Sequence, residues 1–150
     1  MNLHNTTKIN LAKPFLLLLI AFLLFSGDIK IINAQAPEGK IIKIEASDNK
    51  TLTGIIINPD KISVKKDTIL IWLNSISGHD INIIFEDRKK LEKSIADPMG
   101  FSINSRGYFS ADYLPHIATA SLRFIKPGSY SYSATSRDGK VTANGTIVVY

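Results

Sequence analysis

The sequence has 150 residues and contains no cysteine, one tryptophan and two methionines. Without cysteine the chain forms no disulfide, so an apolar core must stabilise the fold. A thiolate nucleophile or metal ligand is excluded for the same reason. The sequence also lacks a Gly-x-Ser-x-Gly elbow, a phosphate-binding glycine loop and a His-Glu-x-x-His helix. We therefore predict that the protein is not an enzyme.

The chain has only a small excess of positive charge. The formal net charge is +5, and 15 basic and 12 acidic residues, a net +3, remain once residues 1–34 are left out. The basic residues are dispersed, apart from the short runs Lys65-Lys66 and Arg88-Lys89-Lys90. A nucleic-acid surface shows a denser basic stripe with aromatic platforms. We expect no nucleic-acid partner.

The amino terminus has the pattern of a secretory signal peptide. Lys8 and Lys13 precede the apolar run Phe15–Phe25, and a more polar stretch ends at Ala34. The run is shorter than the roughly 20 residues of a spanning helix. We predict a signal peptide over residues 1–34 and a domain over 35–150, exported to the periplasm or the extracellular space, with no membrane span after cleavage. An uncleaved anchor is the alternative.

Short alternating segments dominate the rest of the chain and predict seven or eight strands. Period-two patterns and β-branched runs place them at 39–47, 52–57, 62–64, 68–74, 79–85 and in three segments after 118. Thr68–Asn74 is apolar at nearly every position, which predicts a central strand covered on both faces. Glu86–Pro115 breaks the pattern, with a helical turn or two around Leu91, and is expected to be one long irregular loop. The fold class is an all-β sandwich.

Three segments in this order resemble the cupredoxins, the plastocyanin- and azurin-like family, over roughly residues 39–150. They are "INPDKISVKKDTILIWLN" with its Trp-x-Asn, "GHDINIIF" and "FIKPGSYSYSA". Trp72, Asn74, His79, Phe85, Pro127, Gly128 and Tyr130 carry most of the match. Lys66 departs from the glycine that is common before the residue equivalent to Asp67. The resemblance implies a cupredoxin-like Greek-key β-sandwich.

The same resemblance implies that the copper site is degenerate. A blue copper site uses two imidazoles, a thiolate and a weak axial ligand such as methionine. His79 matches the first histidine, but Ala134 stands at the cysteine position, Arg137 stands at the second histidine, and no methionine follows. Alanine has no donor atom, and the guanidinium remains protonated. We expect Arg137 to point into solvent, because a buried guanidinium would need an anion or a carboxylate partner such as Asp138 or Asp80.

Two functional hypotheses follow. The first is an exported binding or accessory module without cofactor, whose partner is an unknown envelope protein or small ligand and whose recognition surface is the 86–115 segment. In it, His79 packs on the inner face beside Ile81 and Ile83, Met99 caps the core and His116 is an exposed loop residue. The alternative is a copper-binding or copper-delivery protein with a metal site made of His79, His116 and Met99, because imidazole and thioether donors suit Cu(I).

Overall fold

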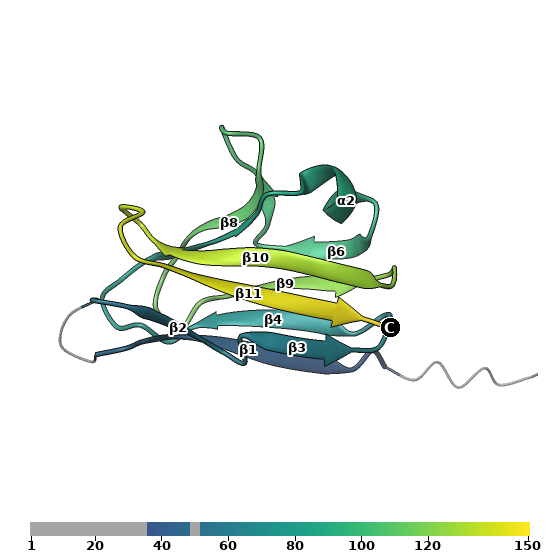
Figure 1. Ribbon diagram of the computed structural model, residues 1–150, viewed down its shortest axis with the longest axis horizontal. Helices are drawn as coiled ribbons and strands as arrows, with labels where there is room; N and C mark the ends of the chain where they lie inside the picture. Colours follow the sequence, from purple (N-terminus) through teal and green to yellow (C-terminus); the bar gives the residue numbers. More distant parts are fainter. Residues whose placement is uncertain (1–35, 49–51) are drawn as a thin grey trace, which may run out of the picture. The chain divides into compact units, whose positions relative to one another are not determined.

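In the computed structural model, residues 36–48 and 52–150 are described. They form two β-sheets packed face to face, with a single short helix among these residues (Figure 1). The predicted signal peptide lies outside the described residues. The first sheet has the strand order β2-β1-β4-β9-β6, and the second has the order β3-β11-β10-β5-β8-β7. The predicted all-β sandwich is confirmed.

The elements follow the chain with short connections. Their bounds are β1 (Gly39–Ala46), β2 (Ile55–Asn58), β3 (Lys61–Val64), β4 (Ile69–Asn74), β5 (Ile81–Phe85), α2 (Arg88–Glu92), β6 (Ile95–Met99), β7 (Ser102–Ile103), β8 (Phe109–Leu114), β9 (Thr119–Phe124), β10 (Gly128–Ser136) and β11 (Thr142–Val149). Two pairs, β1 with β4 and β3 with β11, are parallel, and the others are antiparallel.

The segment 86–115 differs from the irregular loop that we expected. It contains the predicted helical turn as α2, followed by β6, β7 and β8, and Phe101, Phe109 and Ala111 of this segment belong to the core. Local pattern concealed these strands because β6 carries Pro98 and pairs with β9 through a register shift, and β7 has two residues. Eleven strands therefore stand in the described part of the chain where seven or eight were predicted.

The core lies between the two sheets and centres on Trp72, which is fully buried on β4. Its ring meets those of Phe85, Phe101 and Tyr132 edge to face, with centroids 5.8, 5.4 and 5.5 Å away. Edge-to-face contacts suit the aromatic quadrupole, and each large buried side chain contributes about 1.5–3 kcal/mol. This cluster fixes the spacing of the sheets without any disulfide.

Strand β4 is covered on one face only, so the prediction of a strand buried on both faces is wrong. Leu70, Trp72 and Asn74 are fully buried, whereas the alternate residues Ile69, Ile71 and Leu73 are half-buried. These three lie on the outer face of the first sheet. Apolar composition alone does not reveal whether a second layer covers a strand, and among the described residues none does here.

Candidate functional site

The end of the sandwich that carries His79 is organised by Asn74, the last residue of β4. Its side chain is fully buried, and Nδ2 donates to the carbonyls of His79 (2.8 Å) and Leu114 (2.9 Å). Its Oδ1 accepts from the Ile76 N–H at 2.9 Å, and its backbone carbonyl accepts from the Ile117 N–H at 2.8 Å. One asparagine therefore holds both loops at this end, which explains the Trp-x-Asn pattern in the sequence.

His79 lies in the turn before β5, and its side chain is exposed. The expectation that it packs on the inner face beside Ile81 and Ile83 is wrong. Those two residues are fully buried, as predicted, but the strand begins only at Ile81. The Asn74 side chain binds the His79 carbonyl and keeps this residue in the turn. The alternation of inward and outward side chains therefore begins at Ile81 and does not predict the direction of the His79 side chain.

Arg137 points into solvent, as predicted. Its side chain is 69% exposed, and Nη1 lies 3.1 Å from Asp80 Oδ2, so Asp80 is the carboxylate partner. The guanidinium also lies over the ring of Tyr113, 5.0 Å from its centroid. Such a pair contributes little to stability because it is exposed, but it places a carboxylate beside the positive charge of the arginine.

Ala134 is buried, whereas His79 is exposed. Ala134 is fully buried and pairs with Ile83 on β5 and Ala143 on β11. His79 instead lines a groove with residues of the β10–β11 turn. We call it the Arg137 groove, lined by Leu52, Gly78, His79, Asp80, Ser136, Arg137, Asp138, Lys140 and Val141. Ala134 is not among these residues, because its side chain is buried in the core.

The charges of the Arg137 groove are largely paired with one another. Ser136 Oγ donates to Asp138 Oδ1 at 2.7 Å, and Lys140 Nζ lies 3.0 Å from Asp138 Oδ2. The hydrogen bond from Ser136, followed by those from Lys140, holds the pKa of Asp138 well below its usual range. With Arg137 bound to Asp80, the groove is a surface of satisfied ion pairs.

His116 and Met99, the other residues of the predicted copper site, are both exposed. His116 follows β8 in the loop that Asn74 holds at Leu114, whereas Met99 ends β6 and is 69% exposed. The expectation that Met99 caps the core is wrong, because its pairing with Ser121 turns it to the outer face of the first sheet. Neither residue lines the Arg137 groove. In the described ranges, no group of three or more His, Cys, Asp or Glu residues could hold a metal ion.

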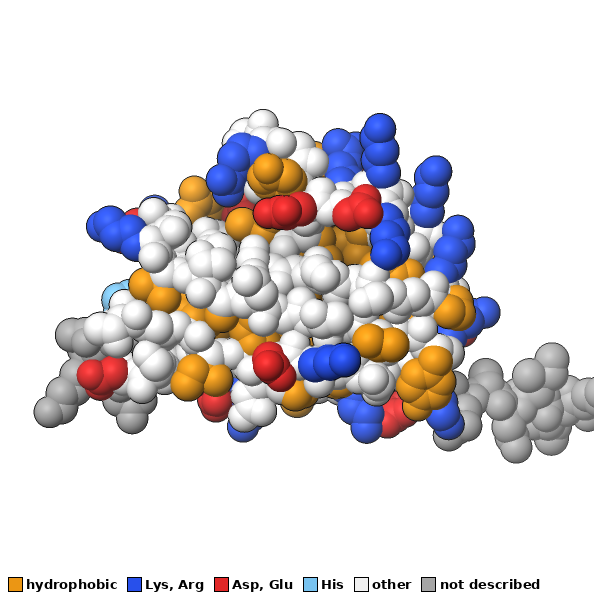
Figure 2. All heavy atoms as spheres, in the orientation of Figure 1, with side chains coloured by type: hydrophobic (Ala, Val, Ile, Leu, Met, Phe, Trp, Pro, Cys, Tyr) orange, Lys and Arg blue, Asp and Glu red, His pale blue; other side chains and the backbone are white. Residues whose placement is uncertain are grey.

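A second groove lies between α2 and β10, and none of the predicted site residues lines it. Its volume is about 440 Å³. It is lined by Ile84, Phe85, Glu86, Asp87, Lys90, Leu91, Ser129, Tyr130, Ser131, Tyr132, Ser133, Asn144, Gly145 and Thr146, and we call it the α2 groove. Figure 2 shows a hollow with apolar side chains at its bottom and charged side chains at its rim. The volume lies in the range of roughly 300–1,000 Å³ that is typical of ligand pockets.

The α2 groove exists because β5 ends too early to pair with the first residues of the antiparallel strand β10. The pairing of β10 with β5 covers Ser133 to Ser136 opposite Ile84 to Ile81, and the chain then leaves the sheet to form α2. Asp87 caps this helix by accepting from the Lys90 N–H at 3.1 Å, and Leu91 anchors it in the core. The helix therefore stands beside the first half of β10 and leaves a gap in the sheet.

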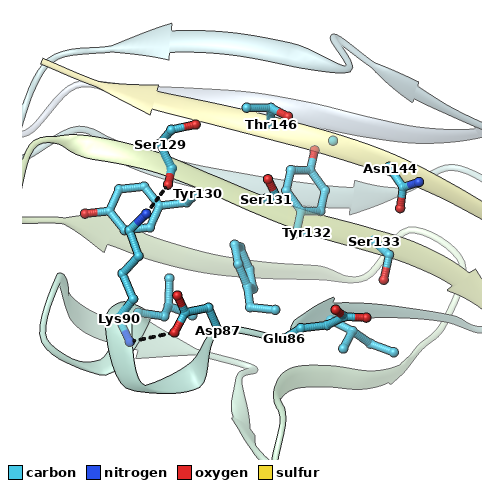
Figure 3. Close-up of a pocket in the computed structure, with 14 residues that line it drawn as sticks. Glu86, Asp87, Lys90, Ser129, Tyr130, Ser131, Tyr132, Ser133, Asn144 and Thr146 are labelled. Carbon is cyan, nitrogen blue, oxygen red and sulfur yellow. Dashed lines mark hydrogen bonds between the residues drawn. The ribbon is translucent and has the colours of Figure 1, made fainter.

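Polar side chains line both walls of this gap (Figure 3). The hydroxyls and amide of Ser131, Ser133, Asn144 and Thr146 stand on β10 and β11, and Glu86 and Asp87 face them from the start of the helical segment. Lys90 reaches across one end, where Nζ donates to the Ser129 carbonyl at 2.7 Å and lies 5.2 Å from the Tyr130 ring centroid. In the sequence, the acidic pair directly after an apolar strand was the one signal of this wall.

No protein-family model matches the chain, and no curated protein matches it. Among solved structures it is similar to variants of amicyanin, a cupredoxin. A reduced Cu(I) form is 14% identical, with 78% of this chain and 85% of that chain covered and a TM-score of 0.43. The Cu(I) form of a methionine-to-alanine variant is 15% identical, with 78% and 87% covered and a TM-score of 0.45. At this level of identity, the function of each site has to be inferred from the residues of this chain.

Proposed function

We propose that the protein is an exported cupredoxin-like binding or accessory module that carries no copper and catalyses no reaction. The observation that supports this most is the pair of residues at the positions where the sequence resemblance expects ligands. Ala134 is fully buried against Ile83 and Ala143 and offers no donor atom. Arg137 is cationic and already paired with Asp80. Both replacements oppose the binding of a metal cation.

The binding role is supported by the α2 groove. A rigid sandwich that presents a polar and partly apolar hollow at the edge of a sheet is a common arrangement for ligand recognition. The groove includes the first residues of the 86–115 segment, which we expected to be the recognition surface. The strands β6, β7 and β8 that follow belong to the sandwich, so we restrict the proposed surface to Glu86–Leu91 and the facing strands.

Export is supported by the sequence of residues 1–34, and it places the module in the periplasm or outside the cell. In the part of the chain that the structure describes, no helix is both long enough and apolar enough to cross a membrane.

The alternative is a copper-binding or copper-delivery protein. One observation favours it: His79 and His116 are both exposed, and Asn74 bonds the carbonyls of His79 and of Leu114, two residues before His116. Met99 is also exposed but belongs to β6 of the first sheet, whereas His79 precedes β5 of the second. The thioether would have to be recruited from another sheet.

Titration of the purified protein with Cu(I) and with Cu(II), monitored by calorimetry, separates the two functions. We expect no tight one-to-one binding of either ion. The same titration of His79→Ala serves as control. Tight stoichiometric binding by the parent that is lost in His79→Ala would replace our proposal with the copper-delivery function.

A further inference from the structure

The β10 wall of the α2 groove presents backbone groups as well as side chains. The Ser136 N–H bonds to Val141 at the β10–β11 turn, so the even-numbered residues of β10 direct their backbone groups toward β11. The odd-numbered residues then face the other way, and the bond from Lys90 Nζ to the Ser129 carbonyl agrees with this direction.

The backbone of Ser131 consequently forms a short stretch of unpaired strand edge inside the groove. Its N–H and C=O face away from β11, and the pairing with β5 begins only at Ser133. The Glu86 carbonyl, which would come next along β5, accepts instead from the Arg88 N–H at 2.9 Å. A donor and an acceptor on one extended residue match the backbone of another extended chain, which is how strand addition recognises peptides.

The opposite wall determines which side chain such a peptide carries. Glu86 and Asp87 are exposed and acidic, and the single ammonium of the groove, on Lys90, is already bonded to the Ser129 carbonyl. The charged residues that line the groove therefore sum to one negative charge. Lys90 also closes the Ser129 end of the edge, so the pairing is confined to Ser131.

We propose that the α2 groove binds a short extended peptide, which pairs with the backbone of Ser131 and places a lysine or arginine side chain beside Glu86 and Asp87. Buried Phe85 and Tyr132 form the apolar part of the groove against which the peptide packs. This inference rests on the proposed function, that of a binding module, and names its ligand class.

The experiment measures binding of a fluorescent, end-blocked peptide, Thr-Val-Lys-Val-Thr, to the purified protein by anisotropy. We expect saturable binding that weakens about tenfold when the peptide backbone is N-methylated at the lysine, because one backbone hydrogen bond is worth up to about 1.5 kcal/mol. Replacement of the lysine by glutamate should abolish binding. Absence of saturable binding, or equal binding of the N-methylated peptide, would overturn the proposal.

Two protein variants locate the backbone contact. Ser131→Pro removes the open N–H and no bond to β11 or β5, and it should weaken binding about tenfold. Ser131→Ala keeps the N–H and should bind within about twofold of the parent. An equal loss in Ser131→Ala and Ser131→Pro would mean that the ligand contacts the hydroxyl, which both substitutions remove, and would refute strand addition. Circular dichroism checks that each variant is folded.

The acidic wall is tested with Glu86→Gln combined with Asp87→Ser. Serine retains the helix cap that Asp87 provides, so the charge is removed without loss of α2. We expect weaker binding and a smaller dependence on salt, and unchanged binding would refute the charge assignment. The result of the copper titration does not depend on the peptide experiment. Tight copper binding would overturn the proposed function. Absence of peptide binding would overturn only this inference.

Discussion

The Arg137 groove and the α2 groove lie on the same sandwich and differ in how completely their polar groups are satisfied. In the Arg137 groove, Arg137 is bonded to Asp80, and Asp138 is bonded to Ser136 and Lys140. In the α2 groove, the backbone N–H and C=O of Ser131 face away from β11, toward the side where the pairing with β5 has not yet begun. The first groove lies at the end that the sequence resemblance marks, yet the second has the open chemistry. Local sequence similarity thus marked the end of the sandwich that carries His79. The better candidate for a binding site is the α2 groove, which arises where the pairing of β5 with β10 ends.

The largest effect that we predict concerns the loops beside the Arg137 groove. Asn74→Ala removes the three side-chain hydrogen bonds to the carbonyls of His79 and Leu114 and from the Ile76 N–H, and it should lower the free energy of unfolding by roughly 2–4 kcal/mol. Urea denaturation measures this value. Asn82→Ala, which removes one bond to the Tyr113 N–H, is the matched control and should cost less. An equal or smaller loss for Asn74→Ala would contradict the organising role of this residue.

The next effect concerns the contact between Gly145 and Tyr132 in the α2 groove. A Cβ on Gly145 would lie 2.3 Å from Tyr132 Cζ, and the Trp72 ring packs against the same tyrosine. Gly145→Ala should therefore destabilise the protein by about 1–3 kcal/mol, as overpacking does. Adding Tyr132→Leu should make the glycine substitution less costly in a double-mutant cycle. Strict additivity of the two substitutions would show that the contact is not responsible.

A pH dependence follows from the buried hydroxyl of Tyr132. Burial raises the pKa of Tyr132 to about 12, and the neighbouring Trp72 acts in the opposite direction but more weakly. The unfolded chain releases this proton near pH 10, whereas the folded protein retains it, so the free energy of unfolding should fall between about pH 10 and 12, by roughly 1–3 kcal/mol. Tyr132→Phe should flatten this fall and cost little at pH 7. Tyr150→Phe, at an exposed position, should leave the fall in place; the same slope in both variants would contradict the assignment.

The smallest effect concerns the ion pair of Arg137. Arg137→Gln removes an exposed pair with Asp80 and should change the free energy of unfolding by less than about 1 kcal/mol, with the difference vanishing at high salt. Urea denaturation at two ionic strengths measures it. A loss as large as that of Asn74→Ala would mean that the groove depends on its charges rather than on Asn74.

Much of the sandwich was predictable because its strands follow period-two patterns. The strand 128–136 places Tyr130, Tyr132 and Ala134 inward, as the alternation requires. The outward direction of Arg137 followed from the cost of burying a guanidinium. The pattern misplaced His79, because a strand's first residue depends on what holds the preceding turn, and here that is the Asn74 side chain, five residues earlier in the sequence.

By itself, the sequence determined the fold class, the inward-facing residues of the long strands and the absence of sulfur and imidazole donors at Ala134 and Arg137. Alternation, residue volume and donor chemistry are local properties. The tertiary structure alone decided that β5 ends before β10 does, that α2 stands beside the open edge, and that the acids of Glu86 and Asp87 face Ser131 and Thr146. These features depend on register between strands more than 40 residues apart in the chain. Register follows from how the whole core packs, and no short segment encodes it.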